Sequence, residues 1–155
     1  MKKIGTIFSP FKKLGDMPVQ PGGGSGVTGR VEIDGQYQPG LADLEGFSHI
    51  YLIYRFHRAR RIEMKVVPFL DTQPRGVFAT RSPLRPNHIG LSLVELVEVK
   101  GTTLTIRNLD ILDGTPLLDI KPYIASFDQV GQSRSGWMKA DRKTVGTCRS
   151  DERFV

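Results

Sequence analysis

Two arginines stand four residues apart in a segment that prolines make rigid. Residues 76–90 read GVFATRSPLRPNHIG, with Arg81 and Arg85 beside two prolines. Each proline fixes its own φ angle and pushes the residue before it towards an extended conformation. A guanidinium group binds a carboxylate or a phosphate through two parallel hydrogen bonds. The segment therefore predicts a preorganised binding loop. The alternative is that the arginines hold the loop together by binding backbone carbonyls.

A second polar segment holds three aspartates among aliphatic residues. Residues 108–123 read NLDILDGTPLLDIKPY. Asp113 precedes a glycine and is typical of a turn, whereas Asp119 shares strand parity with Lys121 and can pair with it. Asp110 ends a predicted hairpin strand and can point into a site. If the two segments meet, arginines face acids beside a backbone turn.

A run of cations interleaves with Tyr54 and Phe56 and continues beyond them. The whole chain carries a net charge of +6 and has a pI of about 9.7, which favours polyanions such as RNA or anionic cofactors. Clustered arginines suit the phosphates of an RNA backbone. The alternative is an ordinary solvated face. The run comprises Arg55, Arg58, Arg60, Arg61 and Lys65.

Several other kinds of site are not supported by the spacing. The glycine-rich residues 22–26 have neither the Gly-Lys-Ser/Thr ending of a P-loop nor a βαβ context, so they favour a flexible turn or a backbone that approaches a ligand. The histidines His49, His57 and His88 have no metal-ligand spacing, and a lone Cys148 can form neither an internal disulfide nor a cysteine zinc cluster. We expect no metal.

The chain has features of an intracellular protein. A single cysteine points to a reducing compartment. The N-terminus has no signal-peptide apolar run, and no stretch approaches the roughly 20 apolar residues of a membrane span. The sequence therefore predicts a soluble, cytoplasmic protein that does not enter a membrane.

Short strands must position these residues, because 17 glycines and 10 prolines punctuate all 155 residues. This pattern predicts a mainly β chain with one helical turn at 41–44, and closure into a barrel would remove exposed strand edges. We expect a single β-barrel-like domain at 1–125 and an irregular C-terminal tail or arm at 126–155. Expected strands are 4–8, 30–33, 49–57, 66–70, 76–80, 117–120, and a hairpin of 91–99 with 102–109 around Lys100-Gly101.

Five motifs together resemble the TsaA-like family, also called TrmO or YaeB-like, which includes VirR-type proteins. The resemblance covers roughly residues 3–124 in order, and the joined Arg-Pro-Asn and Asp-Gly-Thr-Pro motifs are highly specific. The motifs are IGTIFSPFK at the N-terminus, QPG at 20–22, FSHIYLIYRFHR at 47–58, GVFATRSPLRPNHIGLS from 76 and DGTPLLDIKPY from 113.

The resemblance implies an S-adenosylmethionine-dependent methyltransferase with a β-barrel instead of a Rossmann-like fold. Its substrate would be the N6 nitrogen of threonylcarbamoyladenosine, next to the anticodon of a tRNA. It also implies a homodimer with the cofactor near the subunit interface. The alternatives are a methyltransferase for another nucleoside or a small molecule, and a non-enzymatic RNA-binding barrel.

The resemblance implies the cofactor contacts, and the side-chain chemistry suggests the catalytic and RNA-binding roles. Asp110 and His57 are the candidate catalytic bases, and Arg81 could clamp a carboxylate of the cofactor or substrate. Asp110 or Asp113 could face the cofactor's sulfonium. Expected RNA contacts are Arg55, Arg60, Arg61, Lys65 and Arg85. Expected cofactor contacts are Gln20, Pro21, Gly22, His57, Arg58, Arg81, Leu91, Asn108, Leu109, Asp110, Ile111, Asp113, Gly114 and Thr115.

Three features depart from the family pattern. His88 stands where many members have proline, which predicts a slightly less rigid loop. Further glycines follow Pro21 where Gly-Leu is commoner, which predicts a looser lid. The sequence does not include the extra C-terminal domain of longer bacterial members, so the nature of the substrate stays open at this point.

Overall fold

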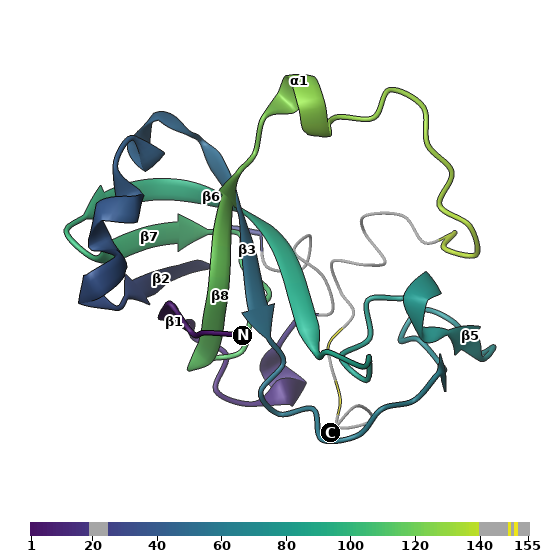
Figure 1. Ribbon diagram of the computed structural model, residues 1–155. Helices are drawn as coiled ribbons and strands as arrows, with labels where there is room; N and C mark the ends of the chain where they lie inside the picture. The colour runs from purple at the N-terminus through teal and green to yellow at the C-terminus, as the bar shows by residue number, and fades with distance from the viewer. Residues whose placement is uncertain (19–24, 140–148, 150, 152–155) are drawn as a thin grey trace.

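Strands close into an antiparallel barrel in the computed structural model, which describes residues 1–18, 25–139, 149 and 151. The order around the barrel is β1-β2-β7-β6-β3-β8, and β8 pairs with β1 to complete the ring (Figure 1). The predicted mainly β, barrel-like fold is confirmed. The barrel strands are β1 (Gly5–Phe8), β2 (Thr28–Ile33), β3 (His49–Arg55), β6 (Ile89–Lys100), β7 (Thr103–Arg107) and β8 (Thr115–Pro122).

Alternation along the strands fills the barrel with aliphatic side chains. On β3, Ile50 and Leu52 are fully buried, and on β6 Val94 occupies an equivalent inward position. Burial of alternate residues on every strand is what a closed barrel requires. The interior is completed by Ile7, Val31, Ile33, Leu96, Leu104, Ile106 and Leu117.

The inward positions change character at one end of the barrel. There β3 presents Tyr54, β6 presents Gly90 and Ser92, and β8 presents Thr115. These polar or small residues share the inward parity of the aliphatic core. The inward-facing side chains at this end of the barrel are therefore polar or small, and we call it the polar end.

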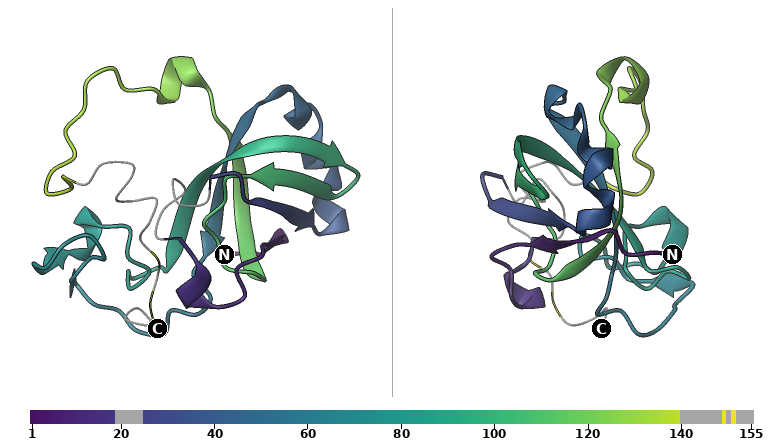
Figure 2. Two further views of the ribbon diagram at one scale, coloured as in Figure 1. Left: turned by 180° about the vertical axis from the view of Figure 1, so that it is seen from behind. Right: turned by 60° about the vertical axis from the view of Figure 1, so that its left-hand side comes forward.

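Residues 56–88 form a lobe outside the barrel, between the paired strands β3 and β6 (Figures 1 and 2). The lobe contains the two-stranded sheet of β4 (Lys65–Val66) and β5 (Arg75–Gly76), followed by a 3-10 helix at Val77–Ala79. Its own small core consists of Val66, Val77 and Leu84. The lobe thus stands beside the polar end of the barrel.

The remaining described elements are short. Helix α1 (Ala125–Asp128) follows β8, and the chain then arches away from the barrel towards the lobe (Figure 1). Further 3-10 helices lie at Leu14–Asp16, Gly35–Leu41 and Leu44–Gly46. None of the helices in the described part of the chain is long and apolar enough to cross a membrane.

Several element boundaries differ from the expectations. The hairpin around Lys100-Gly101 and the Asp119–Lys121 pair are confirmed, the latter with 3.3 Å between Nζ and Oδ2. The strand expected at 76–80 is wrong, because the backbone turns at once and Thr80 Oγ1 donates to the Val77 carbonyl at 2.8 Å. The strand expected at 66–70 stops at Val66, shortly before Pro68, which has no N–H to donate. The helical turn expected at 41–44 overlaps the end of one 3-10 helix at Leu41 and the start of the next at Leu44.

Candidate active site

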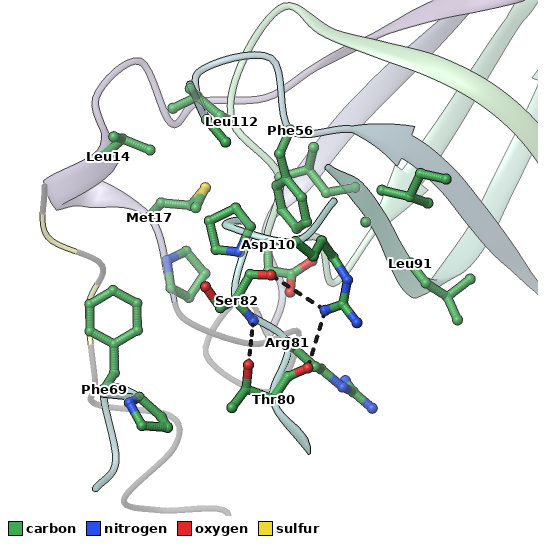
Figure 3. A pocket seen from close by; sticks show the side chains of 18 of the residues that line it. Leu14, Met17, Phe56, Phe69, Thr80, Arg81, Ser82, Leu91, Asp110 and Leu112 are labelled. Atoms are coloured by element: carbon green, nitrogen blue, oxygen red, sulfur yellow. Dashed lines mark hydrogen bonds between the residues drawn. The ribbon is translucent and has the colours of Figure 1, made fainter. Parts of the chain in front are cut away.

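A cavity of about 890 Å³ lies where the polar end of the barrel meets the lobe. The two polar segments singled out in the sequence, 76–90 and 108–123, both contribute to it. Figure 3 shows Arg81 and Asp110 in this cavity, among apolar side chains from other elements. The apolar wall includes Leu14, Met17, Phe56, Phe69, Leu91 and Leu112.

Asp110 presents a carboxylate to the cavity from the connection between β7 and β8. Ser92 Oγ donates a hydrogen bond to Asp110 Oδ1 at 2.7 Å. Burial raises the pKa of the Asp110 carboxyl to about 6, although the Ser92 hydrogen bond and the charge of Arg81 both lower it. A carboxylate with a raised pKa in a cavity is a typical feature of a functional site.

Ser92 and Tyr54 were not predicted as part of the site. The Tyr54 hydroxyl lies 3.1 Å from Ser92 Oγ, and both residues are almost fully buried. Burial, together with the nearby charge of Asp110, raises the pKa of Tyr54 far above its usual range. The available signal was strand parity, because both are polar residues at inward positions of their strands.

The two arginines of the rigid loop have different surroundings. Arg85 donates from Nη1 to the carbonyls of Thr80 and Ser82, at 3.1 and 3.3 Å. Arg81 is exposed at the cavity, and its charge acts on Asp110. Arg85 thus braces the loop, which is the alternative that the sequence left open, while Arg81 faces the cavity.

His88 fixes the end of the same loop. Its φ angle is 49°, in the left-handed region, and its Nδ1 donates to the Pro83 carbonyl at 2.8 Å. The carbonyl can only accept, so the proton of this hydrogen bond belongs to Nδ1. His88 therefore shapes the loop and does not line the cavity.

His57 lines the cavity at the end of β3, next to Arg58. Burial and the charge of Arg58 lower the pKa of His57. Thr115 Oγ1 donates its one proton to the Leu112 carbonyl at 2.6 Å, and His57 Nδ1 lies 3.3 Å from the same oxygen. His57 Nδ1 must then be the donor to Thr115, which leaves Nε2 of the neutral ring able to accept a proton.

Some of the expected cofactor residues do not line the cavity. Leu109 is fully buried in the barrel core, and Asn108 accepts a hydrogen bond from the Gly26 N–H at 2.8 Å. Asp113 accepts from the Ser9 N–H at 3.0 Å and pairs with Lys12 Nζ at 2.6 Å, and this pairing lowers its pKa. The expected residues Asn108, Leu109, Asp113 and Gly114 are absent from the lining, whereas His57, Arg58, Arg81, Leu91, Asp110, Ile111 and Thr115 belong to it.

The remaining expected residues divide into two groups. Gln20, Pro21 and Gly22 lie outside the described residues. Of the expected RNA contacts, Arg85 lines the cavity and Arg61 pairs with Glu63 at 3.1 Å. Arg55, Arg60 and Lys65 are exposed. Within the described part of the chain, no cluster of three or more His, Cys, Asp or Glu side chains could hold a metal ion.

The match to a known family agrees with this arrangement. Residues 6–129 match the family model of the tRNA-methyltransferase O N-terminal domain. The chain belongs to the TrmO family. The resemblance inferred from the sequence motifs is thereby confirmed.

Relatives in the TrmO family carry two kinds of name. A tRNA (adenine(37)-N6)-methyltransferase of Escherichia coli is 41% identical over 90% of this chain and 63% of its own length. An S-adenosyl-L-methionine-binding protein of Archaeoglobus fulgidus is 45% identical over 85% of this chain and 94% of its own length. The crystal structure of TrmO from Pseudomonas aeruginosa superposes with a TM-score of 0.73 at 36% identity, over 88% of this chain and 60% of that one. The chain therefore spans less than two thirds of the methyltransferase relatives it matches.

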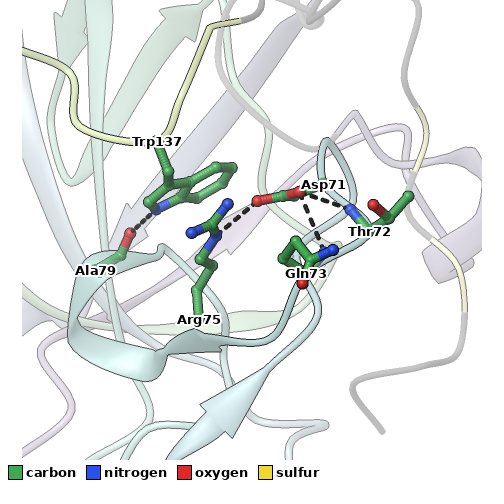
Figure 4. A network of polar contacts seen from close by, with 6 residues as sticks. All are labelled: Asp71, Thr72, Gln73, Arg75, Ala79 and Trp137. Atoms are coloured by element: carbon green, nitrogen blue, oxygen red, sulfur yellow. Dashed lines mark hydrogen bonds and ion pairs between the residues drawn. The ribbon is translucent and has the colours of Figure 1, made fainter.

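The segment beyond the TrmO family match also reaches the cavity. Trp137 Nε1 donates to the Ala79 carbonyl at 2.8 Å, and the Arg75 guanidinium lies 5.6 Å from the centre of the indole ring (Figure 4). Arg75 Nε is paired with Asp71 Oδ2 at 2.7 Å. These contacts attach the segment around Trp137 to the lobe, next to the loop that carries Arg81. Trp137 also lines the cavity. The sequence offered one signal for this role, since Trp137 is the only tryptophan of the chain.

Proposed function

We propose that the chain is an S-adenosylmethionine-dependent tRNA methyltransferase that methylates the N6 nitrogen of threonylcarbamoyladenosine beside the anticodon. The observation that carries this proposal is the cavity of a TrmO-family chain in which Asp110, Arg58 and Arg81 meet apolar walls. The names of the relatives supply the reaction class and the cofactor class.

The residues of the cavity fit S-adenosylmethionine. The volume of about 890 Å³ suits a ligand of that size, since small-molecule sites occupy about 300–1,000 Å³. Arg81 or Arg58 would bind the carboxylate of the amino-acid part, and Phe56 offers an apolar surface to the adenine ring. Asp110 would face the positive sulfur, because a partly buried carboxylate stabilises a nearby cation.

S-adenosylmethionine supplies, when bound, an electrophilic methyl group on a positively charged sulfur, which leaves as a neutral thioether once the methyl carbon bonds to the substrate nitrogen. The residues of the chain would position that nitrogen and accept its proton. At neutral pH the Asp110 carboxyl, with a pKa of about 6, is mostly ionised and able to accept this proton. His57 Nε2 is the second candidate acceptor.

The proposed partner is the anticodon arm of a tRNA. Arg55, Arg60 and Lys65 are exposed on and after the strand that leads to the cavity, which suits contacts with phosphates. Arg61 and Arg85 would add positive charge nearby while remaining engaged with Glu63 and the loop carbonyls. We propose further that the enzyme acts as a cytoplasmic homodimer, as the family resemblance implies.

Methyl transfer to two tRNA preparations tests this function. The purified chain is incubated with S-adenosylmethionine carrying a labelled methyl group and with tRNA that either has or lacks the threonylcarbamoyl group. We expect label only in the modified tRNA, at N6 of the hypermodified adenosine, as located by mass spectrometry of nucleosides. Label in the unmodified tRNA would indicate another nucleoside substrate. The absence of both heat and a thermal shift with S-adenosylmethionine would contradict an enzymatic role.

A further inference from the structure

We infer that Ser92 and Tyr54 are positioning residues for the methyl-transfer reaction, because they form a one-directional hydrogen-bond chain that orients the Asp110 carboxylate in the cavity. This inference rests on the proposed function and adds to it two residues outside the expected cofactor and RNA contacts. Both residues come from the barrel wall, so they would act on the reaction through Asp110.

The direction of the chain follows from counting protons. Ser92 has one hydroxyl proton, and Ser92 Oγ donates it to Asp110 Oδ1 at 2.7 Å. In the contact of 3.1 Å between Ser92 Oγ and the Tyr54 hydroxyl, Ser92 can then only accept. Tyr54 therefore donates to Ser92 and Ser92 donates to Asp110. Each hydroxyl proton is already used in one hydrogen bond, and these two hydrogen bonds hold the Asp110 carboxylate in one orientation.

The barrel keeps the far end of this chain in place. Tyr54 on β3 pairs with Gly90 on β6, and a Cβ atom at position 90 would overlap the Tyr54 ring. The ring also packs edge-to-face against Phe56, with 5.4 Å between the ring centres. Ser92 and Tyr54 are 2% and 5% exposed, so water has little access to compete for either hydroxyl. A site built on paired strands is more rigid than one built on a loop alone.

The electrostatic consequence has a definite sign. The Ser92 hydrogen bond favours the ionised form of Asp110, and so does the positive charge of Arg81, whereas burial opposes it. His57 and Arg58 line the same cavity, and Tyr54 stays neutral because burial raises its pKa. Removing the Ser92 donor must therefore raise the pKa of Asp110. When the pH is lowered, a reaction that needs the ionised Asp110 carboxylate therefore loses its activity at a higher pH in the variant than in the wild type.

Two substitutions in the purified full chain test the inference. In Ser92→Ala we expect the acid limb of the pH–kcat profile to move up by about 1 pH unit, with KM for S-adenosylmethionine changed less than about threefold. Tyr54→Phe should move the limb in the same direction by less. Ser92→Thr, which keeps the hydroxyl, should restore the original limb. The matched control is Ser9→Ala, because Ser9 is also buried but does not line the cavity, and its Oγ accepts from the Phe11 N–H; this variant should leave the acid limb and KM unchanged.

A second measurement separates this inference from the proposed function. The pKa of the Asp110 carboxyl is followed by carbon-13 NMR in the same proteins, which requires no substrate. If the wild-type chain methylates no tRNA but Ser92→Ala raises this pKa, the proposed function fails and the orienting chain stands. If Ser92→Ala and Tyr54→Phe are folded and leave both the pKa and the pH profile unchanged, the inference is overturned.

Discussion

The aromatic ring of Tyr54 lies directly against the backbone of Gly90, in the space that a side chain at position 90 would occupy. The two residues are register partners on β3 and β6, at the polar end of the barrel. The absence of a side chain at position 90 therefore determines where the Tyr54 hydroxyl lies, and through Ser92 where Asp110 lies.

Replacing Gly90 by alanine should damage both stability and the site. The new methyl group would overlap the Tyr54 ring, and overpacking of this kind costs about 1–3 kcal/mol. We expect a lower midpoint in urea unfolding and a loss of methyl transfer larger than the loss of folded protein. The matched control is Gly46→Ala, since nothing lies within 4 Å of a Cβ at that position. Equal effects of the two substitutions would contradict this account.

Asp110→Asn should stabilise the folded protein at neutral pH while it removes activity. The folded state raises the pKa of Asp110 from 3.8 to about 6, so the folded protein holds this proton more tightly than the unfolded chain does. That advantage is complete below pH 3.8 and is lost as the pH rises through 6. Above pH 6 the ionised carboxylate costs about 3 kcal/mol, which asparagine avoids. The midpoint difference between variant and wild type should be large at pH 8 and should vanish near pH 4, as measured by thermal unfolding in a series of buffers.

The barrel could be predicted from the sequence because buried and exposed residues alternate along its strands, and because closing a sheet removes its exposed edges. His49–Arg55 and Ile89–Lys100 bury alternate residues, which is visible in the sequence as a period of two. The lobe was harder to predict. The apolar run around Val66 and Val77 resembles strands, but Pro68 and the turn at Val77–Ala79 leave only two short paired segments.

The site was partly predictable for a similar reason. Arg81 and Asp110 stood out as charged groups in aliphatic or proline-rich surroundings, and both line the cavity. Ser92 and Trp137 did not stand out. A serine gains its importance from the register that brings it to Asp110, and a tryptophan in a polar tail gains its importance from contacts with a distant lobe. Strand parity marks Ser92 as inward-facing and Trp137 is the only tryptophan, but neither local signal names the distant partner of the residue.

Arg81→Ala and Arg85→Ala should fail in different ways. Arg85 donates to the carbonyls of Thr80 and Ser82, so its loss leaves two partly buried acceptors unpaired and costs about 1–2 kcal/mol of stability. Arg81 is exposed at the cavity, so its loss should leave the free energy of unfolding within about 0.5 kcal/mol of wild type. We expect Arg81→Ala to weaken binding of S-adenosylmethionine at least tenfold, as measured by calorimetry. Normal affinity and turnover in a folded Arg81→Ala protein would refute its proposed role.

Trp137 should report the attachment of the C-terminal segment to the lobe. It is the only tryptophan, so fluorescence excited at wavelengths that the four tyrosines do not absorb comes from this one indole. The described contacts of its ring with the lobe are one hydrogen bond to Ala79 and the stacked guanidinium of Arg75. Residues 125–136, which connect Trp137 to the barrel, are all exposed, and a segment with so little burial opens more easily than a barrel.

We therefore expect urea to shift the Trp137 emission towards that of a solvated indole before the far-UV circular dichroism of the barrel changes. Arg75→Ala, which removes the stacked cation, should move the fluorescence transition to lower urea and leave the barrel transition in place. S-adenosylmethionine should quench or shift the emission, because Trp137 lines the cavity. Superimposable fluorescence and dichroism transitions in both proteins would show instead that the segment and the barrel unfold as one unit.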